Sequence, residues 1–309
     1  MSAWTRSRIS LPEGQGFDRC TLDSGKPGLR VVVFGGTHGD ETEGVLAASR
    51  LAGAAVALRA GMLDIVPIVH EAAYFNDTRV SPLDGGNLAR VFPGDPNGGP
   101  TARLAHALQT TVLAGADLLI DLHTSGQSYD IPFLAGYIDD GRDRKGLGAR
   151  AATAFGADFI WRHETRAPGR TISGIDAAIY TEAPLPGPTD PSFVDRYHAG
   201  VLRVLMTLNM IDTASAPPPP PRPAQRIVSG GNVDTDLQTA GTAGLFIHKT
   251  RQGEKVAKGQ PLGEIIDIAG RVLETLRAPA DGWVVVLKRR PHVQPGDPVV
   301  GVAVADTRG

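Results

Sequence analysis

Two side chains with metal-binding chemistry lie three residues apart in the segment GGTHGDETEG, residues 35–44. They are His38 and Glu41, and the segment follows the apolar run LRVVVFGG directly. An imidazole and a carboxylate at this spacing on a turn can converge on one cation, and nitrogen with oxygen ligation suits zinc. Taken alone, the pattern also fits a glycine-rich turn with a helix-capping acid, so the chemistry depends on what the rest of the chain adds.

A second histidine follows another predicted strand. The run DLLIDLHT, residues 117–124, is apolar enough for a buried strand and ends near His123. Because ligands bind outside the carboxyl ends of strands in parallel α/β sheets, His38 and His123 are expected at the same edge. Three protein ligands with a fourth position left for water is the arrangement of catalytic zinc. We therefore predict one Zn²⁺ per chain on His38, Glu41 and His123, a set that iron or cobalt would also accept.

A zinc-activated water also needs a base. Glu182, in IYTEAP at the end of another predicted strand, is the best placed candidate. Spacing alone leaves the loop carboxylates Glu71, Asp84 and Glu164 open as alternatives. Asp121 shares a strand face with His123 and could accept a hydrogen bond from a metal-bound imidazole, or simply pair with backbone.

The long loop between residues 71 and 100 carries two arginines. Arg79 lies in NDTRVSP and Arg90 in GGNLARVFPG. A fork-shaped guanidinium suits a substrate carboxylate or a developing oxyanion, although a surface arginine is often only solvated. A loop this long inside a compact domain is usually functional or disordered.

The elements that must position these residues alternate along the chain. An edge strand and a turn are expected within 1–28. Apolar runs and helical periodicities then predict strands at 29–34, 62–70, 117–124, 157–162 and 177–183, and helices at 41–61, 101–116, 143–155 and 193–211. This alternation predicts an α/β fold with a largely parallel sheet covered on both faces.

A proline-rich segment, APPPPPRPAQ, marks a change of character. We expect an α/β domain over 1–214, a semi-rigid linker over 215–225 and an all-β domain over 226–309. The last part consists of short runs separated by Gly/Pro turns, which suggests a small barrel or sandwich. A PxxP ligand is the weaker reading of the prolines, since a domain junction explains them.

Composition excludes several partners. The chain has 309 residues, a formal charge of -2 and one cysteine, Cys20. This charge gives no reason to expect nucleic acid or an anionic membrane, and no apolar run approaches the roughly 20 residues of a spanning helix. The N-terminus lacks the apolar region of a secretory signal, and a single cysteine excludes both an internal disulfide and a cysteine-rich metal site. A cytoplasmic location is expected.

Several motifs together resemble those of the succinylglutamate desuccinylase/aspartoacylase family, within the zinc carboxypeptidase clan. That family carries a G-x-H-G-x-E turn, a D-L-H strand, an R-x-S-P-x-D-G-x-N-L-N-R-x-F-P-G loop and a late catalytic glutamate. The chain has GTHGDE at 36–41, RVSPLDGGNLARVFPG at 79–94, DLH at 121–123, and Glu182 about where the glutamate falls. The resemblance covers the chain from about residue 28 to the end of the α/β domain.

The resemblance implies a role for each matched residue. His38, Glu41 and His123 would be the zinc ligands, and Glu182 the base that activates water and then protonates the leaving amine. Arg79 would polarise the scissile carbonyl. Arg90 and Asn87 would bind the substrate, with Arg90 gripping its carboxylate. The family hydrolyses N-acyl groups from amino acids, so the expected activity is that of an N-acyl amino acid deacylase.

Two positions depart from the family pattern. Ala89 stands where the family usually has Asn before the arginine, which removes one carboxylate-binding amide. The amino-acid end of the substrate is therefore expected to be held differently or to be a different molecule. Ala183-Pro184 replaces the usual glycine pair after Glu182 and stiffens the loop beside the base.

The C-terminal segment resembles the barrel-sandwich fold of biotinyl and lipoyl domains. Its corresponding hairpin stretch, IDIAGRVLET, contains no lysine, so a carrier role is disfavoured. Such a domain could shield the site, mediate a homo-oligomer, or simply pack. Two other functions stay open beside a deacylase. One is a metallocarboxypeptidase acting on peptides, and the other is a non-catalytic member that binds a ligand or partner.

Overall fold

A large mixed sheet runs through the molecule. The structure is a computed structural model that describes residues 3–184, 189–212, 214, 226–230 and 236–306. β11 (Gln238–Thr239) pairs with β18, and β6 (Tyr129–Asp130) pairs with β16. In sheet order the other strands are β1 (Thr5–Ser10), β2 (Gly16–Asp23), β4 (Met62–Val66), β3 (Arg30–Gly35), β5 (Leu118–Leu122), β9 (Ala178–Glu182), β7 (Leu134–Ile138), β8 (Phe159–His163), β10 (Arg226–Ser229), β18 (Pro298–Ala305), β16 (Gly282–Lys288) and β13 (Lys255–Val256).

The four central strands, β4, β3, β5 and β9, are parallel. Their mostly apolar runs suit strands that are buried on both faces. In the register of β3 with β5, Gly35 lies opposite Leu122. The segments that follow these two strands therefore leave the sheet at the same edge, as the sequence predicts for His38 and His123.

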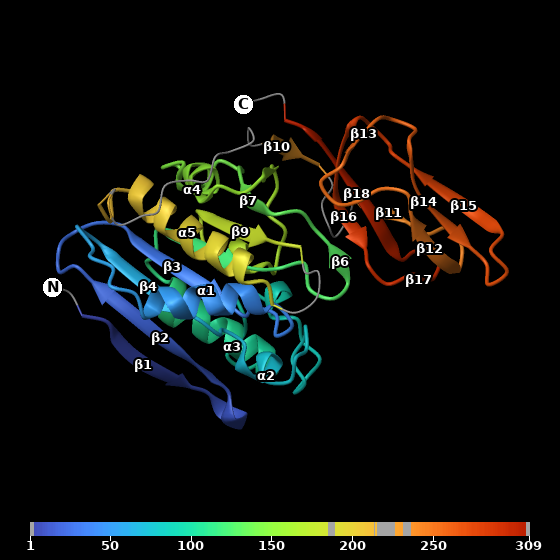
Figure 1. Ribbon diagram of the computed structural model, residues 1–309. Helices are drawn as coiled ribbons and strands as arrows, with labels where there is room; N and C mark the ends of the chain where they lie inside the picture. The colour runs from blue at the N-terminus through green and yellow to red at the C-terminus, as the bar shows by residue number, and fades with distance from the viewer. Residues whose placement is uncertain (1–2, 185–188, 213, 215–225, 231–235, 307–309) are drawn as a thin grey trace.

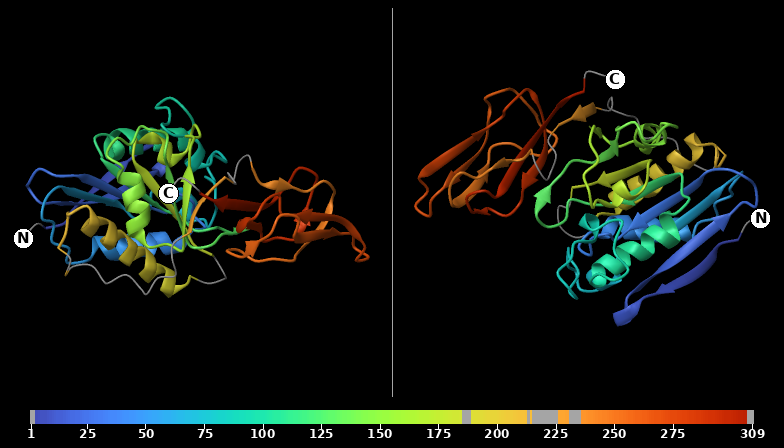
Figure 2. Two further views of the ribbon diagram at one scale, coloured as in Figure 1. Left: turned by 90° about the horizontal axis from the view of Figure 1, so that it is seen from above. Right: turned by 180° about the vertical axis from the view of Figure 1, so that it is seen from behind.

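Helices cover both faces of this central region (Figure 1 and Figure 2). Side chains alternate along β3, so Val31 and Val33 face one layer while Val32 and Phe34 face the other. The first layer contains α1 (Thr42–Ala52), α4 (Leu147–Phe155) and α5 (Pro191–Thr207). The second contains α3 (Pro100–Leu108) and the π-helical turn η3 (Gln109–Leu113). The predicted α/β fold is confirmed.

Some predicted boundaries were wrong. The helix expected over 41–61 ends at Ala52, because Gly53 caps it through its backbone N–H. Val56 and Leu58, which continue the apolar period, pack against the core from a non-helical segment. β7 was not predicted; it runs antiparallel to β9 and parallel to β8. The long loop contains two short elements, α2 (Glu71–Tyr74) and the 3-10 turn η2 (Leu88–Arg90).

The C-terminal part is all-β. A second, antiparallel sheet contains β15 (Val272–Arg277), β14 (Pro261–Ile266), β12 (Gly244–His248) and β17 (His292–Val293). The large sheet also enters this part, since β10 pairs in parallel with β8 and antiparallel with β18. The predicted linker, 215–225, lies outside the described residues, and the division into domains stays a prediction. No helix in the described ranges is both long and apolar enough to cross a membrane.

Candidate active site

The turn between β3 and α1 presents His38 and Glu41 at the carboxyl edge of the sheet. Its backbone lies tightly against α2, since a Cβ on Gly39 would meet the Ala73 carbonyl oxygen at 2.1 Å. Glu41 is the residue before α1, yet its side chain makes no capping hydrogen bond. The helix-capping alternative for this acid is therefore not what the structure adopts, and the carboxylate is used elsewhere.

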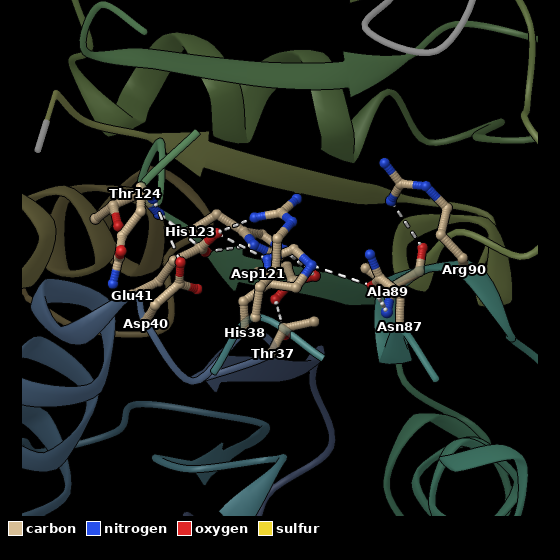
Figure 3. Close-up of polar contacts among 12 residues, drawn as sticks. Thr37, His38, Asp40, Glu41, Asn87, Ala89, Arg90, Asp121, His123 and Thr124 are labelled. Atoms are coloured by element: carbon tan, nitrogen blue, oxygen red, sulfur yellow. Dashed lines mark hydrogen bonds and ion pairs between the residues drawn. The ribbon is translucent and has the colours of Figure 1, made fainter. Parts of the chain in front are cut away.

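The carboxylate of Glu41 lies between two imidazoles (Figure 3). His38 Nδ1 is 2.8 Å from Oε1, and His123 Nδ1 is 2.8 Å from Oε2. Arg79 Nη1 also donates to Oε1 at 3.0 Å, and the backbone N–H of Thr124 donates to Oε2 at 3.1 Å. All three candidate ligands are buried, and one ligand atom from each lies within 4.8 Å of the others. This group could bind one metal ion.

The outer nitrogen of each imidazole has its own partner. His123 Nε2 lies 3.0 Å from Asp121 Oδ2, and Thr37 donates to the other oxygen of Asp121 at 2.8 Å. His38 Nε2 lies 3.2 Å from Asn87 Oδ1, an atom identified as oxygen because it accepts the N–H of Ala89 at 3.0 Å. Both contacts favour a hydrogen on Nε2, so a neutral ring in either position would direct its Nδ1 lone pair toward Glu41.

Electrostatics distinguish the two histidines. Burial lowers the pKa of His38, so its ring is neutral near pH 7. Burial would lower the pKa of His123 too, but Asp121 and Glu41 raise it well above its ordinary value. Burial alone would raise the pKa of Glu41, yet His38 and His123 beside it lower that pKa well below its ordinary value. A neutral imidazole carries one ring N–H, but both ring nitrogens of His38 have an oxygen neighbour. The nitrogen without a hydrogen therefore directs its lone pair at an oxygen, which is unfavourable unless a cation lies between them.

A cavity opens over this group. Its lining includes His38 and His123, together with three residues predicted from the sequence: Arg79, Arg90 and Glu182. Burial, and then the charge of Glu41, raise the pKa of Glu182 well above its ordinary value. Oε2 of Glu182 is buried and has no hydrogen-bond partner among the described residues. A raised pKa is the direction of shift that a carboxyl group needs for general acid–base chemistry near neutrality.

The three alternative carboxylates lie outside this cavity lining. Glu71 pairs with Arg8, with Nη2 and Oε2 2.7 Å apart. Asp84 accepts the backbone N–H of Thr101 at 2.9 Å and so holds the loop against α3. Glu164 is exposed. Among the carboxylates weighed as a base, the cavity therefore favours Glu182, whose role stays a prediction.

Asn87 lies beneath His38 rather than in the cavity lining. Its oxygen contacts the imidazole and caps η2 through Ala89 N–H. Figure 3 shows Ala89 and Arg90 on the same side of the site as Asn87. The predicted substrate contact of Asn87 is untested, and its oxygen is already used to orient His38.

The far wall of the cavity was not predicted. It comes from β8, β9 and the 3-10 turn η4 (Thr171–Gly174). His163 Nε2 and the hydroxyl oxygen of Tyr180 are 2.8 Å apart, and the ring of Trp161 lies tilted against that of His163 with centroids 5.1 Å apart. Burial lowers the pKa of His163 to about 4. No local motif marks these residues, because only the pairing of distant strands brings them to the site.

Comparison with known proteins gives consistent results. A family model described as the succinylglutamate desuccinylase/aspartoacylase catalytic domain matches residues 27–205. An N-alpha-acetyl-L-2,4-diaminobutyric acid deacetylase from Halomonas elongata is 28% identical over 288 residues, which cover 89% of this chain and 82% of that protein.

Solved structures are similar over almost the whole chain. A succinylglutamate desuccinylase/aspartoacylase from Rhodobacter sphaeroides is 29% identical with a TM-score of 0.83, covering 99% of this chain and 96% of that one. The product-bound ectoine utilization protein EutE (DoeB) from Ruegeria pomeroyi has a TM-score of 0.82 at 24% identity, covering 98% and 95%. At that identity the second likeness concerns the fold alone.

Proposed function

Since the chain belongs to the succinylglutamate desuccinylase/aspartoacylase family, we propose that it is a zinc-dependent deacylase of small N-acylated amino acids or related amines. Family membership supports a hydrolase acting on amides. The observation that carries the proposal is the convergence of His38 Nδ1 and His123 Nδ1 on the two oxygens of Glu41, beneath a cavity that Glu182 also lines.

His38, Glu41 and His123 would hold the metal, with Asp121 and Asn87 fixing the two rings from behind. The nitrogen and oxygen donors fit zinc, and the opposed His38 and Glu41 lone pairs fit a cation. A zinc ion bound there would supply Lewis-acid chemistry, polarising the scissile carbonyl and lowering the pKa of the attacking water toward about 7.

The remaining steps belong to side chains of the cavity. Glu182 would take a proton from the attacking water and then deliver it to the leaving amine, so that amide and water give a carboxylic acid and a free amine. Arg79, already beside Glu41, would donate hydrogen bonds to the developing oxyanion. Arg90 would bind the substrate carboxylate. Asn87 would contact the substrate only through its amide nitrogen, because its oxygen already contacts His38 and the N–H of Ala89.

The test combines metal analysis with a substrate panel. Elemental analysis of the purified protein is expected to give about one zinc per chain, and chelation should abolish turnover that added Zn²⁺ restores. The panel contains N-acetyl amino acids, N-alpha-acetyl-L-2,4-diaminobutyrate, N-succinyl-L-glutamate and short peptides. Release of acetate or succinate from small N-acyl amino acids supports the proposal.

Other outcomes identify the two alternative functions. Release of C-terminal residues from peptides, without deacylation, would make the protein a metallocarboxypeptidase. A protein with no affinity for zinc and no turnover would be a non-catalytic ligand-binding member. Both results contradict the proposal, and each does so through a different measurement.

A further inference from the structure

The carboxylate-binding end of the cavity has an apolar residue at a position where a donor is expected. Ala89 is buried and lines the cavity beside Arg90, so the amide of the usual Asn is missing at that point. A substrate carboxylate bound by Arg90 alone would have fewer hydrogen-bond donors than its two oxygens accept. A replacement donor would have to come from another segment at the same wall.

The turn η4 packs against η2, as α3 does. A bridge joins the two regions, in which Phe92 N–H donates to the Gly169 carbonyl at 2.9 Å. Gly169 has φ +79°, and a Cβ there would meet the Arg90 carbonyl oxygen at 2.2 Å. This close approach holds Arg170 and Thr171, the next two residues, beside Ala89 and Arg90, and all four line the cavity.

Thr171 has an unused hydroxyl. Its residue is 3% exposed, and within the described ranges Oγ1 has no hydrogen-bond partner. A buried hydroxyl without a partner is unfavourable, so one on a residue that lines a cavity can be satisfied by a group of the ligand. Thr124 and Ser125, also in the lining, carry buried hydroxyls of the same kind, but they follow His123 in the chain rather than Gly169. By contrast, Ser173 in the same turn donates to the Ala167 carbonyl at 2.6 Å, and Gln109 donates to the Gly174 carbonyl at 2.9 Å. The turn is therefore anchored by other groups, and the hydroxyl of Thr171 is not used for that purpose.

Two guanidinium groups lie at this wall. Arg90 and Arg170 line it, whereas the two carboxylates of the lining, Asp121 and Glu182, interact with the predicted metal ligands. We propose that Thr171 donates a hydrogen bond to the substrate carboxylate beside Arg90 and takes the place of the amide that Ala89 lacks. This inference rests on the proposed function, since it names how the amino-acid end of that substrate is held.

Kinetics of four variants test the inference, using the best N-acetyl amino acid from the panel. Thr171→Val keeps the shape and removes the hydroxyl, so KM should rise about tenfold or more with kcat nearly unchanged. Thr171→Ser should stay near wild type. Ala89→Asn in the Thr171→Val background should recover part of the lost affinity, because it restores an amide donor. Thr165→Val is the control, an exposed threonine that lines the same cavity.

Two results would overturn the inference. An unchanged KM in Thr171→Val means that water satisfies the hydroxyl, and a loss confined to kcat means that Thr171 only shapes the turn. Thermal unfolding checks that Thr171→Val is folded. If it is not, Ala89→Asn in the otherwise wild-type protein decides. If Thr171 already donates to the carboxylate, the added amide is redundant and should lower KM only slightly, and a large decrease in KM would contradict the inference.

A binding measurement separates this inference from the proposed function. Calorimetry on Glu182→Gln compares N-acetyl-L-aspartate and N-alpha-acetyl-L-2,4-diaminobutyrate with their α-carboxamides. Binding that needs the carboxylate and weakens about tenfold in Thr171→Val supports the inference even if no N-acyl amino acid is hydrolysed. Binding that is indifferent to the carboxylate, or no binding at all, contradicts it.

Discussion

The two ends of the cavity differ in how their polar groups are satisfied. At the metal end, His38, His123 and Glu41 are bonded to one another, and each imidazole has a further partner on its outer nitrogen. At the carboxylate end, Ala89 is apolar and the hydroxyl of Thr171 has no partner among the described residues. The predicted metal ligands are therefore held by their own hydrogen bonds, while Glu182 Oε2, which also lines the cavity, has no partner among the described residues. In our proposal, the second end is completed by a ligand. Changes at the metal end should therefore act on metal binding and chemistry, and changes at the other end on affinity.

The largest effect is expected from His123→Ala. Loss of a partner behind a ligand typically weakens metal binding about 10- to 100-fold, so loss of the ligand itself should exceed that and abolish turnover. Elemental analysis and chelator competition measure it. His292→Ala, an exposed histidine on β17, is the control and should keep both metal and activity. A His123→Ala protein that retains one tightly bound metal would show that the ligand set is wrong.

Replacement of Glu182 separates chemistry from metal binding. Glu182→Gln should lower kcat by about 10²- to 10⁴-fold, because the amide cannot take the proton of water, while metal content stays unchanged. Steady-state kinetics with metal analysis measure both quantities. Glu71→Gln, a carboxylate outside the cavity lining, is the matched control. Near wild-type activity in Glu182→Gln would remove the base assignment.

The outer partners of the two imidazoles, Asp121 and Asn87, should differ in how much they contribute to metal affinity. Asp121→Asn replaces a charged acceptor on His123 and should weaken metal affinity about 10- to 100-fold. Asn87→Ala removes a neutral, longer contact on His38, so its effect should be smaller. Chelator competition on both variants gives the order. Equal losses would mean that charge on the outer acceptor does not matter here.

A smaller effect, on the free energy of unfolding, is expected from His163 in the far wall of the cavity. His163 is neutral in the folded protein because burial lowers its pKa to about 4, whereas in the unfolded chain it titrates near 6.5. The unfolded state therefore binds more protons between these values, and the contribution of His163 is present above pH 6.5 and lost as pH falls toward 4. Between pH 7 and pH 4.5, the unfolding free energy of the wild type should therefore fall by roughly 2 kcal/mol more than that of His163→Gln. Urea unfolding at several pH values measures it, and an identical slope in both proteins would contradict the burial argument.

Local chemistry made the metal end predictable. His38 and Glu41 are three residues apart on one turn, and the parallel pairing of β3 with β5 brings His123 to the same edge. Apolar periodicity predicted most strands and helices, and it failed where capping overruled it at Gly53 or where β7 joined the sheet by long-range pairing.

The carboxylate end depended on contacts between distant segments. The sequence identified Arg90 and the missing amide at Ala89, but it contained no sign that Thr171 would lie beside them. That proximity comes from the bridge between Phe92 and Gly169, which are far apart in the chain. By itself the sequence determined the fold class, the family and the residue types of the candidate metal site, because these depend on local period and spacing. Only the tertiary structure placed Thr171 in the cavity lining with a buried hydroxyl that has no partner among the described residues, because that depends on how separate loops pack.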